Sequence, residues 1–158
     1  MESAEILALP YVDTHTAVVA AGPEAVWREL GRVADRSFSG GRTSLVARLL
    51  GCADRTARGP RPLAEGSALA GFRVAAAVPG HELALVGRHR FSSYALVFRL
   101  DEVGEAQTRV RAETRARFPG PAGAVYRGLV IGTGGHRIAV RRMLAQVERR
   151  VVRERSGG

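Results

Sequence analysis

The sequence predicts an α+β domain that combines an antiparallel sheet with two short helices and one long terminal helix. Three observations support this class. Apolar residues recur at helical spacing after residue 22, alternate with other residues between positions 67 and 118, and return to helical spacing from residue 122. The alternating segments are joined by short links, which indicates antiparallel pairing. We expect a single domain over residues 11–153, with flexible ends at residues 1–10 and 154–158.

The first strand and the two short helices are expected before residue 52. A strand is predicted at residues 14–20. Gly22-Pro23-Glu24 is typical of a helix start, because proline suits the first turn and glutamate is favoured by the helix dipole. A second helix is predicted at residues 43–50, ended by Gly51. Residues 58–66 are rich in proline and glycine, which predicts a loop.

The sheet is expected to continue after Ser67 through four alternating segments, at residues 68–78, 82–91, 94–101 and 108–118. In the last of these, four arginines and one glutamate alternate with small and apolar side chains. Successive side chains of a strand point to opposite faces of a sheet. One face is therefore expected to meet water and the other an apolar layer.

The terminal segment, residues 122–154, predicts a long amphipathic helix. Glycine costs about 1 kcal/mol relative to alanine inside a helix, and three glycines lie within residues 132–135. They predict a kink or two helical pieces, and they are also compatible with an anion-binding helix start. The apolar stripe steps by three or four residues through Val125, Leu129, Gly132, His136, Val140, Met143, Val147 and Val151.

The chain is strongly basic, with a formal net charge of +9. All 24 basic residues are arginine, and the absence of lysine excludes Schiff-base enzymes and a Walker-type phosphate loop. A basic domain can bind nucleic acid through phosphate contacts. Here the arginines are spread along the chain and many alternate with apolar residues on predicted strands. This distribution favours a solvated outer face over a nucleic-acid partner.

Cysteine and histidine usage excludes several kinds of site. Cys52 is the single cysteine, so neither an intramolecular disulfide nor a zinc site built on thiolates is expected. The four histidines lack metal-ligand spacing, and we expect no metal and no cofactor. No stretch approaches 18 uncharged apolar residues, and Glu2 and Glu5 stand where a signal peptide is basic. We expect a cytoplasmic chain without a membrane span, and a homodimer stays open.

Three segments resemble a known superfamily. Residues 16–27, TAVVAAGPEAVW, resemble the strand and the Pro-Glu-x-Val-Trp helix start of the START-like (SRPBCC) superfamily. The strand pair from Arg90 to Leu100 and the stretch at residues 118–136 are similar as well. The resemblance covers about residues 11–150. It points to the polyketide cyclase/dehydrase and lipid-transport branch and to an actinobacterial subgroup.

The resemblance implies a helix-grip fold, in which a curved antiparallel sheet holds the long terminal helix and an apolar cavity lies between them. Strand alternation then indicates the cavity side, because Glu82, Arg88 and Arg99 mark the solvated face. Small residues such as Gly87 and Ala112 are expected to leave space there. The predicted ligand-binding residues are Leu85, Gly87, His89, Phe91, Tyr94, Leu96, Phe98, Ala112, Thr114, Tyr126, Leu129, Thr133 and His136.

Three of these side chains are candidate catalytic residues if the protein is an enzyme: His136, His89 and Tyr94. A neutral imidazole can hydrogen-bond a ligand carbonyl or move a proton near neutral pH. The alternative for each histidine is a structural hydrogen bond to a backbone carbonyl. For Tyr94 the alternative is a packed ring whose hydroxyl has a buried partner.

Three functions stay open at this point. The first is binding of a small hydrophobic or amphipathic molecule, such as a lipid, a polyketide or an aromatic metabolite, in an internal cavity. The second, implied by the resemblance, is a polyketide-type cyclase, aromatase or dehydratase that uses a cavity His or Tyr for proton transfer. The third is a basic interaction module with a vestigial cavity.

Overall fold

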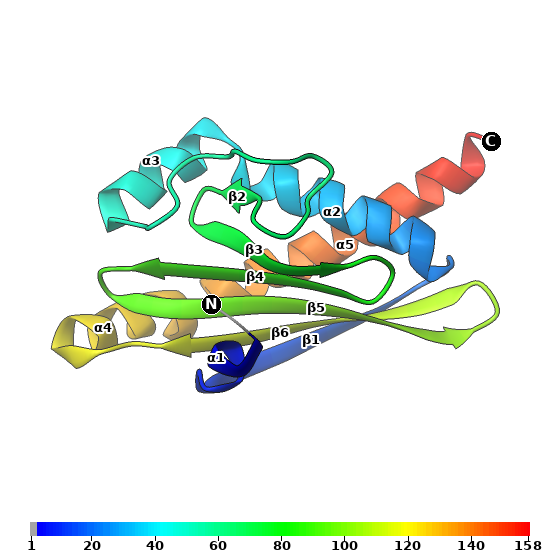
Figure 1. The fold of residues 1–158 in the computed structure, drawn as a ribbon. Helices are drawn as coiled ribbons and strands as arrows, with labels where there is room; N and C mark the ends of the chain where they lie inside the picture. Colours follow the sequence, from blue (N-terminus) through cyan, green and yellow to red (C-terminus); the bar gives the residue numbers. More distant parts are fainter. Residues whose placement is uncertain (1–2) are drawn as a thin grey trace.

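A computed structural model describes residues 3–158 and contains a six-stranded sheet with helices on both of its faces (Figure 1). Every pair of neighbouring strands is antiparallel. The predicted α+β class is confirmed. The strands are β1 (Tyr11–Val19), β2 (Ala68–Leu69), β3 (Phe72–Val78), β4 (Glu82–His89), β5 (Ser92–Gly104) and β6 (Gln107–Arg117), in the spatial order β1-β6-β5-β4-β3-β2.

The helices are unequal in length and in position. Helices α2 (Pro23–Phe38), α3 (Gly41–Leu50) and α5 (Gly135–Ser156) lie over the inner face of the sheet, and α1 (Ser3–Leu7) lies over the outer face (Figure 1). No helix within residues 3–158 is long and apolar enough to cross a membrane. The two remaining helical elements are α4 (Gly120–Arg127) and the π-helical turn η1 (Gly128–Gly132).

The main core lies between the inner face of the sheet and the helices α2 and α5. Leu85, Phe98 and Val110 project inward from three adjacent strands and are fully buried against Leu30 of α2 and Val147 of α5. Full burial of an apolar side chain of this size contributes about 1.5–3 kcal/mol. The alternation predicted for these strands therefore placed these side chains on the correct, inner face of the sheet.

A buried carboxylate joins α2 to α5. Glu29 of α2 is 1% exposed and forms ion pairs with Arg32 of the same helix and, over 3.5 Å, with Arg150 of α5. Arg32 also contacts Glu154 of α5 over 2.9 Å. A buried charge is tolerated only when it is paired, so these arginines are part of the α2–α5 interface.

The N-terminal segment differs from the flexible end expected at residues 1–10. Residues 1 and 2 lie outside the described part. Residues 3–7 form α1, and Ile6 and Leu9 are buried on the outer sheet face against Ala84 and Val97. This face is therefore partly apolar and covered, and not wholly solvated as predicted. At the other end α5 continues to Ser156, into the expected flexible end at residues 154–158.

Two glycines interrupt elements that the sequence predicted as continuous or left open. The single strand expected at residues 68–78 is divided into β2 and β3 by a turn at Gly71, whose φ is +87°. The terminal helix is divided before α5 at Gly134, whose φ is +75°. Glycine adopts positive φ without the steric cost that other residues meet. Of the two alternatives that the sequence left open, one long helix or two pieces divided near residues 132–135, the structure shows the division.

Candidate functional site

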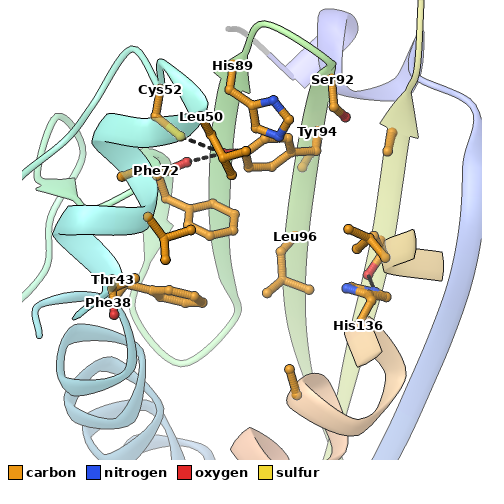
Figure 2. A pocket seen from close by; sticks show the side chains of 18 of the residues that line it. Phe38, Thr43, Leu50, Cys52, Phe72, His89, Ser92, Tyr94, Leu96 and His136 are labelled. Carbon is orange, nitrogen blue, oxygen red and sulfur yellow. Dashed lines mark hydrogen bonds between the residues drawn. The ribbon is translucent and has the colours of Figure 1, made fainter. Parts of the chain in front are cut away.

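A pocket lies on the inner face of the sheet, toward the end of the molecule where α3 and α4 are found (Figures 1 and 2). Its volume is about 260 Å³, just below the ~300–1,000 Å³ usual for small-molecule sites. Strands β4, β5 and β6 form one wall, and α3, η1 and the first turns of α5 form the other. The apolar lining comprises Phe38, Val46, Ala47, Leu50, Ala70, Phe72, Ala95, Leu96, Ala116, Phe118, Val130, Ile131, Ala139, Val140 and Met143.

Nearly half of the predicted ligand-binding residues line this pocket. Their side chains come from β4, β5 and β6 and from the helices α4 and α5, although they lie far apart in the sequence. Both candidate catalytic histidines are among them. Their part in binding or catalysis stays a prediction. The six residues are His89, Tyr94, Leu96, Thr114, Tyr126 and His136.

Other predicted binding residues lie outside the lining. Leu85, Phe98 and Ala112 face inward as predicted, but each is fully buried in the main core beneath α2 and α5. Phe91 stacks on the ring of Tyr126, with ring centroids 5.8 Å apart. Strand alternation indicates the face on which a residue lies. It does not indicate where along the strand the overlying helices end, so it cannot separate core residues from pocket residues.

The predicted stripe fails at its beginning because the chain does not continue as one regular helix from α4 into α5. Val125 and Leu129 are 66% and 64% exposed, whereas Val130 and Ile131 line the pocket. The chain turns at Gly134, where φ is +75°, and the segment before this turn is π-helical, so positions before residue 134 do not keep the angular spacing of α5. A stripe extended backward from α5 therefore emerges on the solvent side. Thr133 lies in the exposed turn that follows, where its hydroxyl donates to the carbonyl of Leu129.

Gly87 does not leave open space, contrary to the expectation from sequence. It pairs with Tyr94 across β4 and β5, and a Cβ at residue 87 would overlap the Tyr94 ring and the Gly71 carbonyl oxygen. The Tyr94 hydroxyl donates to that carbonyl over 2.6 Å. Burial raises the pKa of Tyr94 far above its ordinary value. The Tyr94 proton is thus held by the backbone, which makes Tyr94 a poorer proton donor than the sequence suggested.

His89 is buried and held in one tautomer. Its Nδ1 accepts the backbone N–H of Phe91 over 3.1 Å, which assigns the ring proton to Nε2. The side chain is 7% exposed, and burial lowers the pKa of His89 below its ordinary value of 6.5. His89 is therefore neutral at pH 7. Its Nε2–H is the polar group that it can offer to a ligand.

Two further polar side chains line the pocket on the His89 side. Ser92 pairs with His89 across β4 and β5, and its buried Oγ has no hydrogen-bond partner within residues 3–158. Sequence reasoning missed Ser92 because it placed this residue in the turn between two strands. Cys52 Sγ lies 4.0 Å from the Tyr94 hydroxyl oxygen, and burial raises the pKa of the thiol. A neutral thiol is a weak nucleophile, so Cys52 serves as an apolar wall residue.

His136 enters the pocket from the first turn of α5, on the side formed by β6 (Figure 2). Its Nε2 lies 2.9 Å from Thr114 Oγ1 and 3.4 Å from Asp13 Oδ1. The other oxygen of Asp13 lies 3.2 Å from His15 Nε2. Thr114 forms the hydrogen bond to Nε2 of His136, and Asp13 Oδ1 faces the same nitrogen but has no hydrogen-bond partner within residues 3–158, which leaves Nδ1 for a ligand. No group of three or more His, Cys, Asp or Glu suited to a metal ion occurs within residues 3–158.

Asp13 was not predicted as a site residue, although the signal was present. Side chains at positions 13, 15, 17 and 19 share one face of β1, and Val19 on that face is 1% exposed. Alternation therefore placed Asp13 on the inner face of the sheet. The strand predicted at residues 14–20 began one residue too late to include Asp13.

Helix α3 supplies the part of the pocket that the sequence did not reveal. Thr43, Val46, Ala47 and Leu50 line the pocket from this helix. Leu45 and Leu49 of the same helix are exposed, so apolar residues surround much of its circumference. A helix without contrast between its faces gives no indication of which face packs inward.

Comparison with known proteins supports the fold. No family model matches the chain, and no curated protein is significantly similar to it in sequence. At the identities found among solved structures the likeness concerns the fold alone, and it confirms the predicted helix-grip architecture. Similar structures include a point mutant of Thalictrum flavum norcoclaurine synthase in complex with a transition-state analogue (12% identity, TM-score 0.58, 93% of this chain and 99% of that chain), CalU16 from Micromonospora echinospora (18%, 0.52, 90% and 81%) and a conserved protein from Geobacillus kaustophilus (13%, 0.52, 89% and 94%).

The Gly87→Ala variant tests the close approach of Tyr94 to the backbone. The added methyl group must displace the Tyr94 ring, which should lower the free energy of unfolding by about 1–3 kcal/mol in urea titrations. The matched control is Gly31→Ala within α2, where a Cβ meets no atom within 4 Å. The free energy of unfolding of this control should rise by about 0.5–1 kcal/mol, because alanine is favoured over glycine inside a helix. Equal stability of Gly87→Ala and the wild type would show that the Tyr94 ring does not approach residue 87 this closely.

The His89→Gln variant tests the buried neutral imidazole. Because the pKa of His89 is lowered in the folded state, only the unfolded chain takes up this proton as the pH falls below 6.5. Stability is therefore full above pH 6.5 and decreases below it. The wild type should lose stability more steeply than His89→Gln, by at most about 1.4 kcal/mol per pH unit. Parallel pH profiles of unfolding free energy would show that His89 titrates normally.

Proposed function

We propose that the protein binds a small, largely apolar molecule in the pocket beneath α3 and α5, such as a lipid, a polyketide or an aromatic metabolite. The observation that carries this proposal is the lining, in which apolar side chains surround only a few polar groups. Burial of apolar ligand surface there supplies the binding free energy, and the polar groups orient the ligand. The pocket volume of about 260 Å³ suits one or two rings or a short chain.

The polar groups on the His89 side favour a ligand that carries a carbonyl or hydroxyl oxygen. His89 can donate from Nε2, because its Nδ1 is used by the backbone N–H of Phe91. The unpartnered hydroxyl of Ser92 lies on the neighbouring strand. A buried polar group without a partner carries a cost of about 1–3 kcal/mol, which a ligand oxygen would relieve. An oxygen at this position therefore adds affinity and sets the orientation.

Filling the pocket tests the binding proposal. Ala116 lines the pocket and is buried, so Ala116→Leu places three extra carbon atoms in the ligand space. We expect the wild type to bind 2-naphthol more tightly than naphthalene, by up to about tenfold for one hydrogen bond, in calorimetric titrations. Ala116→Leu should weaken binding of both compounds at least about tenfold.

The matched control is Ala20→Leu, at an exposed position outside the pocket lining, which should bind both compounds as the wild type does. If the Ala116→Leu variant folds and binds both compounds as tightly as the wild type, the ligand binds outside this pocket. If no compound in a panel of small aromatic and aliphatic molecules binds to the wild type, the proposed function is contradicted.

A second candidate function is proton transfer on a carbonyl substrate, the chemistry of a polyketide-type cyclase, aromatase or dehydratase. The contact of Asp13 with His136 Nε2 favours it, because a carboxylate at Nε2 stabilises the proton there and leaves Nδ1 as a base. Thr114 positions the same ring. Tyr94 is the weaker candidate, since its hydroxyl is bound to Gly71. An apolar pocket would also exclude water from the reacting carbon.

Deuterium exchange into a ketone tests this second function without knowledge of the substrate. We expect the wild type to accelerate the exchange of hydrogen for deuterium at the carbon beside the carbonyl of cyclohexanone. The exchange is measured by proton NMR in deuterated buffer. His136→Gln should lower that rate about 10²–10⁴-fold, and Asp13→Asn by a smaller factor. His81→Gln, at an exposed histidine outside the pocket lining, is the matched control. A wild-type rate equal to the buffer rate would contradict catalysis while leaving binding intact.

A further inference from the structure

Large apolar side chains are exposed on both sides of the pocket. Leu45, Val46 and Leu49 of α3 are 58%, 52% and 70% exposed, and Val125 of α4 and Leu129 of η1 are 66% and 64% exposed. We call these five residues the entrance patch. Single exposed apolar residues are ordinary, but a group of them beside a pocket marks an interaction site.

The pocket reaches the surface between the two halves of the entrance patch. Val46 is half exposed to solvent and also lines the pocket, and Ala139 of α5 is likewise both exposed and part of the lining. Ile131 of η1 lines the pocket two residues after Leu129. Figure 1 shows α3 and α4 at the same end of the sheet, and Figure 2 shows α3 facing the strands across the pocket. The apolar surface therefore borders the ligand's route into the protein.

The same elements carry positive charge only. Residues 36–53 and 114–147, which contain α3, α4, η1 and the first half of α5, hold none of the chain's 15 acidic residues. Arg42, Arg48, Arg127 and Arg137 are exposed, and none of these four forms an ion pair with any group in residues 3–158. By contrast, the β5–β6 hairpin at the opposite end of the sheet carries acidic residues at positions 101, 102 and 105 (Figure 1).

This combination selects among the partners that could cover the entrance patch. A symmetric contact between the entrance patches of two copies of the chain would bring unpaired arginines against unpaired arginines, which is costly. Nucleic acid would satisfy the charge, but the patch offers aliphatic side chains and no aromatic ring on which a base could stack. An anionic lipid surface satisfies both features, since aliphatic side chains enter the interface while arginines meet the phosphate groups.

We propose that the entrance patch docks on the surface of an anionic lipid membrane and presents the open pocket to it. Docking itself follows from the exposed leucines and valines and the unpaired arginines. The further step, in which an apolar ligand passes between the lipid layer and the pocket, rests on the proposed binding function. A route that opens onto lipid spares an apolar molecule the transfer through water.

Vesicle flotation with the full chain tests the docking. We expect the wild type to float with vesicles of phosphatidylcholine and phosphatidylserine in about a 2:1 ratio and to bind pure phosphatidylcholine much less. Arg42→Gln with Arg127→Gln should lower the partition coefficient about fivefold for each arginine removed. Leu49→Gln should weaken binding as well, including at high salt, where the charge attraction is screened.

The matched control is Arg109→Gln with Arg149→Gln, which removes the same charge from exposed positions on β6 and in the second half of α5. This control should float as the wild type does. If both double variants lose the same amount of vesicle binding, the binding depends only on net charge, and the proposal is overturned. Tighter binding to duplex DNA than to vesicles, lost in the Arg42/Arg127 variant, would overturn it in favour of a nucleic-acid partner.

The docking and the pocket fail separately. Ala116→Leu should lose 2-naphthol binding but float normally, and Arg42→Gln with Arg127→Gln should bind 2-naphthol in solution but float poorly. A wild type that floats but binds no small molecule would refute the pocket function and keep the docking. A wild type that binds 2-naphthol but does not float would refute the docking alone.

Discussion

The pocket depends on the fact that α5 packs closely on the sheet over only part of its length. Val147 and Val151 are buried in the core, and the ion pair of Glu29 with Arg150 joins this part of α5 to α2. Val140 and Met143 belong both to the core and to the pocket wall, so they mark the boundary. Before them the chain turns away through η1. The strands beyond the boundary therefore face α3 across open space.

Small side chains and a separate support for α3 keep this space open. Ala47, Ala116 and Ala139 line it from three elements and project little volume. Protein interiors are otherwise close-packed, and a cavity lowers stability by removing contacts. Phe38, just before α3, packs on Phe72 of β3 with ring centroids 4.6 Å apart. This contact ties the α2–α3 junction to the sheet, so the cavity persists although collapse would bury more apolar surface.

The sequence predicted the sheet better than the helices, for a physical reason. Alternation along a strand is local and has a period of two, so it correctly placed Leu96, Thr114 and His89 on the inner face. The position of a helix on a sheet depends on contacts between distant segments. Helix α3 therefore could not be assigned to the pocket, and the turn at Gly134 together with the π-helical geometry of η1 moved Leu129 off the predicted stripe. Residues 3–9 were too short to show a pattern.

The polar groups of the pocket give it a direction. In His89 the backbone uses Nδ1, which leaves a donor at Nε2. In His136 the oxygens of Thr114 and Asp13 face Nε2, and a carboxylate there favours a proton on that nitrogen, which leaves an acceptor at Nδ1. Figure 2 shows the two imidazoles on different sides of the pocket. A ligand with an acceptor at one end and a donor at the other is therefore complementary in one orientation, and reversing it would place donor against donor.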